Sequence, residues 1–167
     1  MPPLIAFIGW HDSGKTTLVR QVLTHLRDRG YVVAVIKSTK ERGIACDRPG
    51  SDTARYREAG ADGVALLAPD RLIVQSEPPA CDLPVLAERL FPEADIVLAE
   101  GFKHADVPKI EVRRDSTAPL LRDQVPGVIA VAAEPPLDGE PCFRLDQSRE
   151  IAALIEARLL GGRAAKR

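Results

Sequence analysis

Near its start, the chain carries the sequence Gly9-Trp-His-Asp-Ser-Gly-Lys-Thr16, which matches the Walker A pattern G-x-x-x-x-G-K-[ST]. The apolar run before it, Leu4–Ile8, predicts a buried strand, and residues 17–29 after it predict a helix. This order of strand, loop and helix is the context in which the motif binds phosphate. The segment therefore predicts an α/β protein of the P-loop class that binds a nucleoside triphosphate.

Each part of this loop has an expected contact with the nucleotide. The backbone N–H groups of residues 9–14 are expected to surround the phosphates, helped by the positive end of the following helix. Lys15 is expected to reach the β- and γ-phosphates, and the hydroxyl of Thr16 to bind Mg²⁺. The predicted nucleotide-binding residues of the loop are Gly9, Asp12, Ser13, Gly14, Lys15 and Thr16.

Bulk composition limits the class of protein. A length of 167 residues with 45% hydrophobic and 28% charged residues predicts one globular domain over residues 1–162, followed by a solvated basic tail at residues 163–167. A net charge of −1 gives no electrostatic case for nucleic acid as a partner. The three cysteines are widely spaced, and no apolar run is long enough for a membrane helix. We expect a cytoplasmic protein without a disulfide framework.

Further apolar patterns alternate between strands and helices along the chain. Strands are predicted at residues 31–36, 63–68, 71–76, 96–99, 109–113 and 128–133, and helices at residues 51–60, 83–90 and 148–160. Pro69-Asp70 predicts a hairpin turn, so residues 63–76 are expected to be antiparallel. The rest predicts a three-layer α/β fold with a mostly parallel sheet, whose ligands bind beyond the carboxyl ends of the strands.

Two charged residues stand at such carboxyl ends. Glu100 follows the apolar strand at residues 96–99, the place of a Walker B carboxylate beside Mg²⁺. A solvated carboxylate is the alternative, and Asp95 at the other end of the strand is interpreted as a cap or surface charge. Lys37 follows the strand at residues 31–36 and is interpreted as a phosphate contact or an exposed lysine. Asp52 is predicted as a Mg²⁺ ligand with Thr16 and Glu100, or as a helix cap.

A basic segment follows the proposed Walker B strand. Lys103, His104 and Lys109 are candidates for contacting a second anionic substrate, and Lys103 is included among the predicted ligand-binding residues. The sequence lacks the guanine-reading N-K-x-D or T-K-x-D pattern and an obvious catalytic glutamine. We therefore predict at most weak hydrolysis and assign no catalytic residue.

Several segments together resemble the MobB family, molybdopterin-guanine dinucleotide biosynthesis protein B. They are residues 7–18, Val35-Ile-Lys37, Asp47-Arg-Pro-Gly-Ser-Asp-Thr53, residues 57–61, Ala94-Asp-Ile-Val-Leu-Ala-Glu-Gly-Phe-Lys-His104, Pro108-Lys-Ile-Glu111 and residues 128–132. The resemblance covers essentially the whole chain. Its loop at residues 47–53 and its E-G-F-K segment are more specific than the P-loop.

The resemblance implies a homodimer that binds GTP and Mg²⁺, hydrolyses GTP weakly, and assists the guanylyltransferase that attaches GMP to molybdopterin. It also implies that Thr17 contacts the phosphates and that Lys37, Asp52 and Glu100 surround phosphate and metal. Molybdopterin itself is a further possible partner. Two other functions stay open from the residues: a P-loop kinase for a small molecule, and a metal-delivery GTPase using Cys46.

Overall fold

A computed structural model describes residues 1–139 and 141–161 of the chain. Its contacts divide the chain into two compact units. Residues 1–39 and the chain from residue 82 onward form one, the sheet unit, and residues 40–81 form the other, the hairpin unit. The predicted tail at residues 163–167 lies outside the described residues, and a single domain over residues 1–162 stays a prediction.

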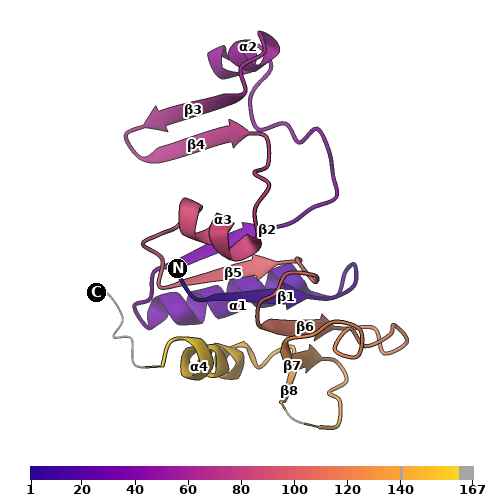
Figure 1. The fold of residues 1–167 in the computed structure, drawn as a ribbon. Coiled ribbons are helices and arrows are strands. Elements are labelled where there is room, and N and C mark those ends of the chain that lie inside the picture. Colours follow the sequence, from indigo (N-terminus) through magenta and orange to yellow (C-terminus); the bar gives the residue numbers. More distant parts are fainter. Residues whose placement is uncertain (140, 162–167) are drawn as a thin grey trace. The chain divides into compact units, whose positions relative to one another are not determined.

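The sheet unit is built on six parallel strands in the order β2-β5-β1-β6-β7-β8 (Figure 1). The strands are β1 (Leu4–Ile8), β2 (Val33–Lys37), β5 (Ile96–Glu100), β6 (Lys109–Arg113), β7 (Val128–Ala133) and β8 (Cys142–Arg144). The predicted parallel sheet is confirmed. Strand β8 was not predicted, because a strand of three residues is too short to show a periodic pattern.

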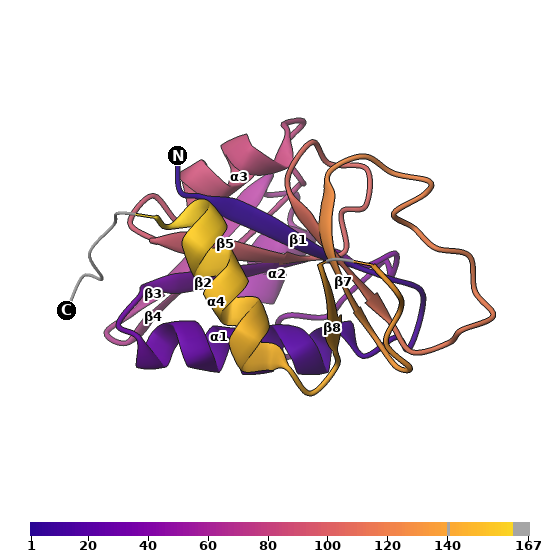
Figure 2. The same cartoon turned by 90° about the horizontal axis from the view of Figure 1, so that it is seen from below.

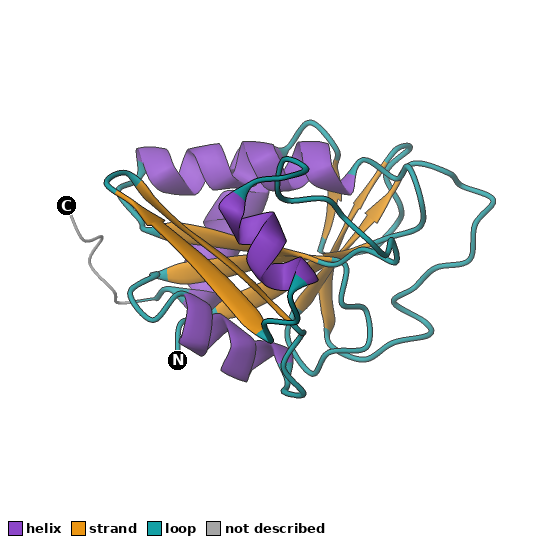
Figure 3. Cartoon of the chain, turned by 90° about the horizontal axis from the view of Figure 1, so that it is seen from above, coloured by secondary structure: helices purple, strands orange, loops and turns teal. Residues whose placement is uncertain are grey.

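Helices cover both faces of this sheet, which gives three layers (Figures 2 and 3). On one face, Ile5 and Phe7 of β1 pack in a cluster with buried side chains of α1 (Lys15–Asp28) and α4 (Ser148–Leu159). On the other face, the alternate residues of β1 pack with side chains of α3 (Leu83–Leu90). The strand is buried on both faces, and this explains its uninterrupted apolar sequence.

Asp95 ties two strands of the sheet together. It is 4% exposed, and one of its carboxylate oxygens accepts a hydrogen bond of 2.8 Å from the backbone N–H of Val32. The interpretation of Asp95 as a surface charge is therefore wrong, because its carboxylate satisfies a backbone donor just before β2.

The hairpin unit contains the short helix α2 (Asp52–Glu58) and two antiparallel strands, β3 (Gly63–Ala68) and β4 (Arg71–Ser76). Ser51 caps α2: its hydroxyl oxygen accepts a 3.2 Å hydrogen bond from the N–H of Ala54. The predicted hairpin is confirmed.

Within the part of the chain that the structure describes, no helix is long and apolar enough to cross a membrane.

Candidate functional site

The loop between β1 and α1 passes so close to β6 that its first residue must be glycine. A Cβ atom at Gly9 would lie 2.3 Å from the carbonyl oxygen of Val112 and 2.5 Å from Ser13 Oγ. Gly14, the last residue before α1, has a φ of 91°, and Asp12 has a φ of 55°. Both values lie in the left-handed region, which is uncommon for a residue with a side chain. The motif residues thus hold the loop in a tight turn against β6.

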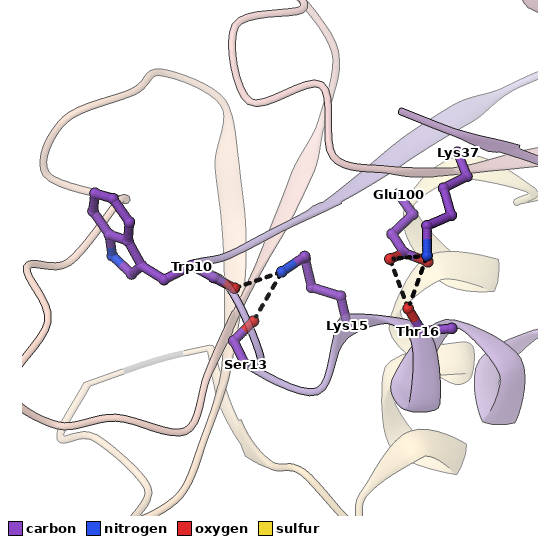
Figure 4. Close-up of polar contacts among 6 residues, drawn as sticks. All are labelled: Trp10, Ser13, Lys15, Thr16, Lys37 and Glu100. Atoms are coloured by element: carbon purple, nitrogen blue, oxygen red, sulfur yellow. Dashed lines mark hydrogen bonds and ion pairs between the residues drawn. The ribbon is translucent and has the colours of Figure 1, made fainter. Parts of the chain in front are cut away.

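The side chain of Lys15 bonds back to the loop that precedes it (Figure 4). Its ammonium group donates hydrogen bonds to the carbonyl oxygen of Trp10 at 2.6 Å and to Ser13 Oγ at 3.3 Å. Burial lowers the pKa of Lys15, the charge of nearby Glu100 opposes this shift, and Lys37 adds to it. The ammonium group is therefore fixed at the mouth of the loop, where a phosphate chain would approach it.

Thr16, Lys37 and Glu100 form a second cluster beside the loop (Figure 4). Thr16 Oγ1 donates to Glu100 Oε1 at 2.7 Å, and Lys37 Nζ lies 3.1 Å from the same carboxylate oxygen. Strand register brings them together, because Glu100 pairs with Lys37 on β2 and with Phe7 on β1. Glu100 is 7% exposed, so it is a buried, paired carboxylate and the solvated alternative is wrong.

The chemistry of this cluster fits Mg²⁺. Magnesium binds hard oxygen ligands and is usually held by one or two carboxylates together with substrate phosphates. The Thr16 hydroxyl and the Glu100 carboxylate supply such oxygens at the start of α1. Lys37 lies 3.4 Å from Thr16 Oγ1 and 3.1 Å from Glu100 Oε1, so its ammonium group would have to turn from these oxygens to a phosphate when the cation binds. These residues would hold the cation next to the phosphates.

The other predicted site residues lie in different surroundings. Thr17 is exposed in the first turn of α1. Lys103 Nζ lies 5.7 Å from the centre of the Trp10 ring, within the range of a cation–π interaction. Asp52 belongs to the hairpin unit and pairs with Arg55 at 3.7 Å, so its role as a Mg²⁺ ligand stays a prediction.

Lys109 does not face a second substrate. It is 1% exposed, and its ammonium group donates to the carbonyl oxygens of Val107 at 3.0 Å and Pro126 at 2.8 Å. Burial lowers the pKa of this lysine. Its function is structural: it holds the segments on either side of β6 against the sheet.

Sequence reasoning missed two arginines at the end of β6. Arg113 is 7% exposed and its Nη2 donates to the carbonyl oxygen of Ser116. The guanidinium nitrogen Nη2 of Arg114 lies 3.4 Å from the position that a Cβ of Gly14 would take. The rule that identified Glu100, a charged residue at the carboxyl end of a strand, could also have identified these arginines. The strand at residues 109–113 was predicted, and it ends at Arg113.

A parallel sheet flanked by helices, with a Walker A loop after β1 and a buried carboxylate at the end of the adjacent β5, defines an α/β protein of the P-loop class. The chain belongs to the MobB family, described as molybdopterin guanine dinucleotide synthesis protein B, whose family model matches residues 4–134. The resemblance seen in the sequence is thereby confirmed.

Individual relatives agree with this assignment. The chain is 36% identical over 144 residues to the molybdopterin-guanine dinucleotide biosynthesis adapter protein of Escherichia coli (strain K12), covering 83% of this chain and 82% of that protein. It is 35% identical to the protein of that name from Haemophilus influenzae, covering 92% and 88%. A crystal structure of molybdopterin-guanine biosynthesis protein B matches with a TM-score of 0.74 and 27% identity, covering 93% of this chain and 99% of that one.

Proposed function

We propose that this chain is a GTP-binding adapter that assists a guanylyltransferase in attaching GMP to molybdopterin during molybdenum cofactor synthesis. The names of the relatives support the pathway, since the Escherichia coli and Haemophilus influenzae relatives are both molybdopterin-guanine dinucleotide biosynthesis adapter proteins. The observation that carries nucleotide binding is the cluster in which Thr16 donates to buried Glu100 directly beside the Walker A loop. A reducing cytoplasm, the compartment we propose, suits the free cysteines Cys46, Cys81 and Cys142.

The residues of the loop bind and orient the nucleotide in this proposal. Backbone N–H groups from Gly9 to Gly14 surround the phosphates, and the dipole of α1 favours their negative charge. Lys15 turns one of its N–H donors from the carbonyl oxygen of Trp10 to a phosphate oxygen. Bound Mg²⁺ would neutralise phosphate charge, and Thr16 and Glu100 would supply oxygen ligands to it. In this proposal the chain hydrolyses GTP only weakly. The bound nucleotide instead serves the partner enzyme.

The hairpin unit supports a homodimer. Several of its large apolar side chains are exposed, among them Leu67 at 80%, Leu72 at 61% and Val74 at 59%. Neighbouring exposed apolar residues on one hairpin are typical of a protein–protein interface. Light scattering after size exclusion should give a dimer for the wild type and a monomer for Leu67→Glu. Leu90→Glu, a matched change at an exposed leucine of α3, should leave the dimer intact.

Isothermal titration calorimetry tests the proposed function. The protein is titrated with GTP and with ATP in the presence of Mg²⁺, and then with a molybdenum cofactor guanylyltransferase. Binding of GTP in preference to ATP, together with binding of the transferase, is the expected result. A protein that binds neither GTP nor the transferase contradicts the proposal. A phosphorylated small-molecule product formed from ATP would favour the kinase alternative instead.

A further inference from the structure

A pocket of about 320 Å³ lies on the outer side of the phosphate-binding loop, against the end of β6. Trp10, His11, Asp12 and Ser13 of the loop line it on one side, and Arg113, Arg114 and Asp115 line it on the other. The residues that fix the nucleotide side of the loop, Lys15, Thr16, Lys37 and Glu100, are not among its walls. The pocket therefore shares residues 10–13 of the loop, but none of the residues of the Thr16–Lys37–Glu100 cluster, with the proposed nucleotide site.

Arg113 brings an incompletely satisfied positive charge to this pocket. The residue is 93% buried, and its Nη2 donates to the carbonyl oxygen of Ser116. Its Nη1 is also buried but has no hydrogen-bond partner among the residues that the structure describes. A buried guanidinium donor without a partner is costly, and most such donors in proteins are satisfied by an acceptor. An anion in the pocket would supply that acceptor once the guanidinium turned Nη1 toward it.

Arg114 stands opposite with a second guanidinium group. Its Nη2 lies 3.4 Å from the position of a Cβ on Gly14, so the positive charge lies at the start of α1. Because the end of α1 is taken up by the nucleotide phosphates in the proposed function, the charge that remains for a second anion is that of the arginine. An arginine fork also matches the oxygens of a phosphate group better than a lysine does.

One of the two acidic residues of the pocket, Asp115, is bound to its own turn. Asp115 accepts hydrogen bonds from the backbone N–H of Thr117 at 2.8 Å and from its hydroxyl at 2.6 Å. These bonds lower the pKa of Asp115, which keeps it ionised and bound to its own turn. Asp12 lies 3.4 Å from the ring of His11. The charge of Arg113 also contributes to lowering the pKa of Asp115, so Arg114 brings the less compensated positive charge to the pocket.

Trp10 gives the pocket an aromatic wall. Its indole N–H donates to the carbonyl oxygen of Pro119 at 2.9 Å, which fixes the ring, and the residue is 40% exposed. Lys103 lies over the same ring, 5.7 Å from its centre. A fixed, accessible indole beside two arginines suits a ligand that combines a phosphate group with an apolar or planar organic part.

We propose that this pocket is a second ligand site, which binds a phosphate monoester through Arg113 and Arg114 while Trp10 contacts its organic part. The pocket shares loop residues 10–13 with the proposed nucleotide site but not Lys15, Thr16, Lys37 or Glu100, and in this proposal it is filled while a triphosphate occupies the loop. It gives the chain a place for a second phosphorylated compound next to the nucleotide. The inference uses the proposed function only in taking the loop as the nucleotide site.

The fluorescence of Trp10, the single tryptophan of the chain, reports directly on the pocket. The protein is first saturated with the non-hydrolysable analogue guanosine 5′-(β,γ-imido)triphosphate and Mg²⁺, and is then titrated with phenyl phosphate and with inorganic phosphate. The variants are Arg114→Gln, at an exposed position, Arg113→Gln, at a buried one, and Arg89→Gln as the control on the exposed face of α3.

The wild type and Arg89→Gln should show saturable binding of phenyl phosphate, tighter than that of inorganic phosphate. Arg114→Gln and Arg113→Gln should weaken it by about tenfold to a hundredfold, the effect of losing a hydrogen bond to a charged group. The affinity of Arg114→Gln for the nucleotide analogue should stay at the wild-type value. If Arg113→Gln fails to fold, Arg114→Gln alone decides the comparison.

Two results would overturn the proposal. One is the absence of saturable phenyl phosphate binding in the wild type. The other is a loss of phenyl phosphate binding once the analogue is bound, together with an equal loss of analogue affinity in Arg114→Gln, because the arginines would then serve the phosphates of the nucleotide itself. Failure of the analogue to bind would count against the proposed function alone, and phenyl phosphate titration of the nucleotide-free protein would still test the pocket.

Discussion

Replacing Gly9 by alanine should destabilise the sheet unit. The new Cβ would stand 2.3 Å from the carbonyl oxygen of Val112 and 2.5 Å from Ser13 Oγ, about an ångström closer than normal contact. Ser13 can rotate its side chain, but Val112 belongs to β6 in the interior of the sheet and cannot retreat. We expect a cost of about 3 kcal/mol, the upper part of the range for overpacked sites.

Thermal denaturation followed by circular dichroism measures this cost. For a chain of this length, 1 kcal/mol lowers Tm by about 2–4 °C, so Gly9→Ala should melt roughly 6–12 °C below the wild type. Gly63→Ala is the control, because the nearest atoms to its Cβ lie at an ordinary 3.7 Å. If Gly9→Ala melts together with Gly63→Ala and the wild type, the loop is not held against β6 as described.

Three further changes test other parts of the site. Lys15→Ala should weaken GTP binding by roughly 10- to 100-fold in calorimetry and weaken GDP binding less, whereas equal losses would place the lysine at the β-phosphate only. Glu111→Gln should lower the free energy of unfolding in urea by about 2 kcal/mol, because Glu111 is fully buried and accepts from two backbone N–H groups, and an unchanged value would contradict this. Burial lowers the pKa of Lys109 in the folded protein, so the unfolded chain binds more protons between the two pKa values and stability rises with pH through that alkaline window. Lys109→Met should flatten this rise in denaturant titrations across the window, and an identical slope would refute the role of burial.

Most of the fold could be predicted from the sequence because its strands lie inside the sheet. Leu4–Ile8 and residues 96–99 are apolar without interruption, as strands covered on both faces are. Pro69-Asp70 marked the hairpin turn, and the strands on either side begin and end at the predicted residues. In these segments a local pattern carried the structural information.

The boundaries of helices were harder to predict from the sequence than those of the strands. Helix α1 begins at Lys15, two residues before the predicted start at Thr17. Polar residues of the motif begin the helix without contributing to its apolar stripe, so periodicity alone cannot find them. The Glu100 site was nevertheless predictable, because a single rule about the carboxyl ends of parallel strands brought it beside the Walker A loop.

Strand β6 shows what the sequence could not reveal. Its charged residues at positions 109, 111 and 113 alternate with Ile110 and Val112, a pattern typical of a strand with one solvated face, yet all five residues are buried. Backbone groups outside the strand satisfy these charges. The lysine donates to the carbonyl oxygens of residues 107 and 126, the glutamate accepts from the N–H groups of residues 121 and 122, and the arginine donates to the carbonyl oxygen of residue 116.

This matching depends on contacts up to 17 residues apart, which no local pattern contains. Backbone carbonyl groups face the cations Lys109 and Arg113, and backbone N–H groups face the anion Glu111. Electrostatics as well as packing therefore determine how the segment after β6 lies against the strand. Among the described residues, the donor of β6 that this scheme leaves without a partner is Arg113 Nη1, at the end of the strand beside the phosphate-binding loop. The rest of the strand is satisfied so fully that this donor stands out, and a turn of the guanidinium toward a ligand in the adjoining pocket would satisfy it as well.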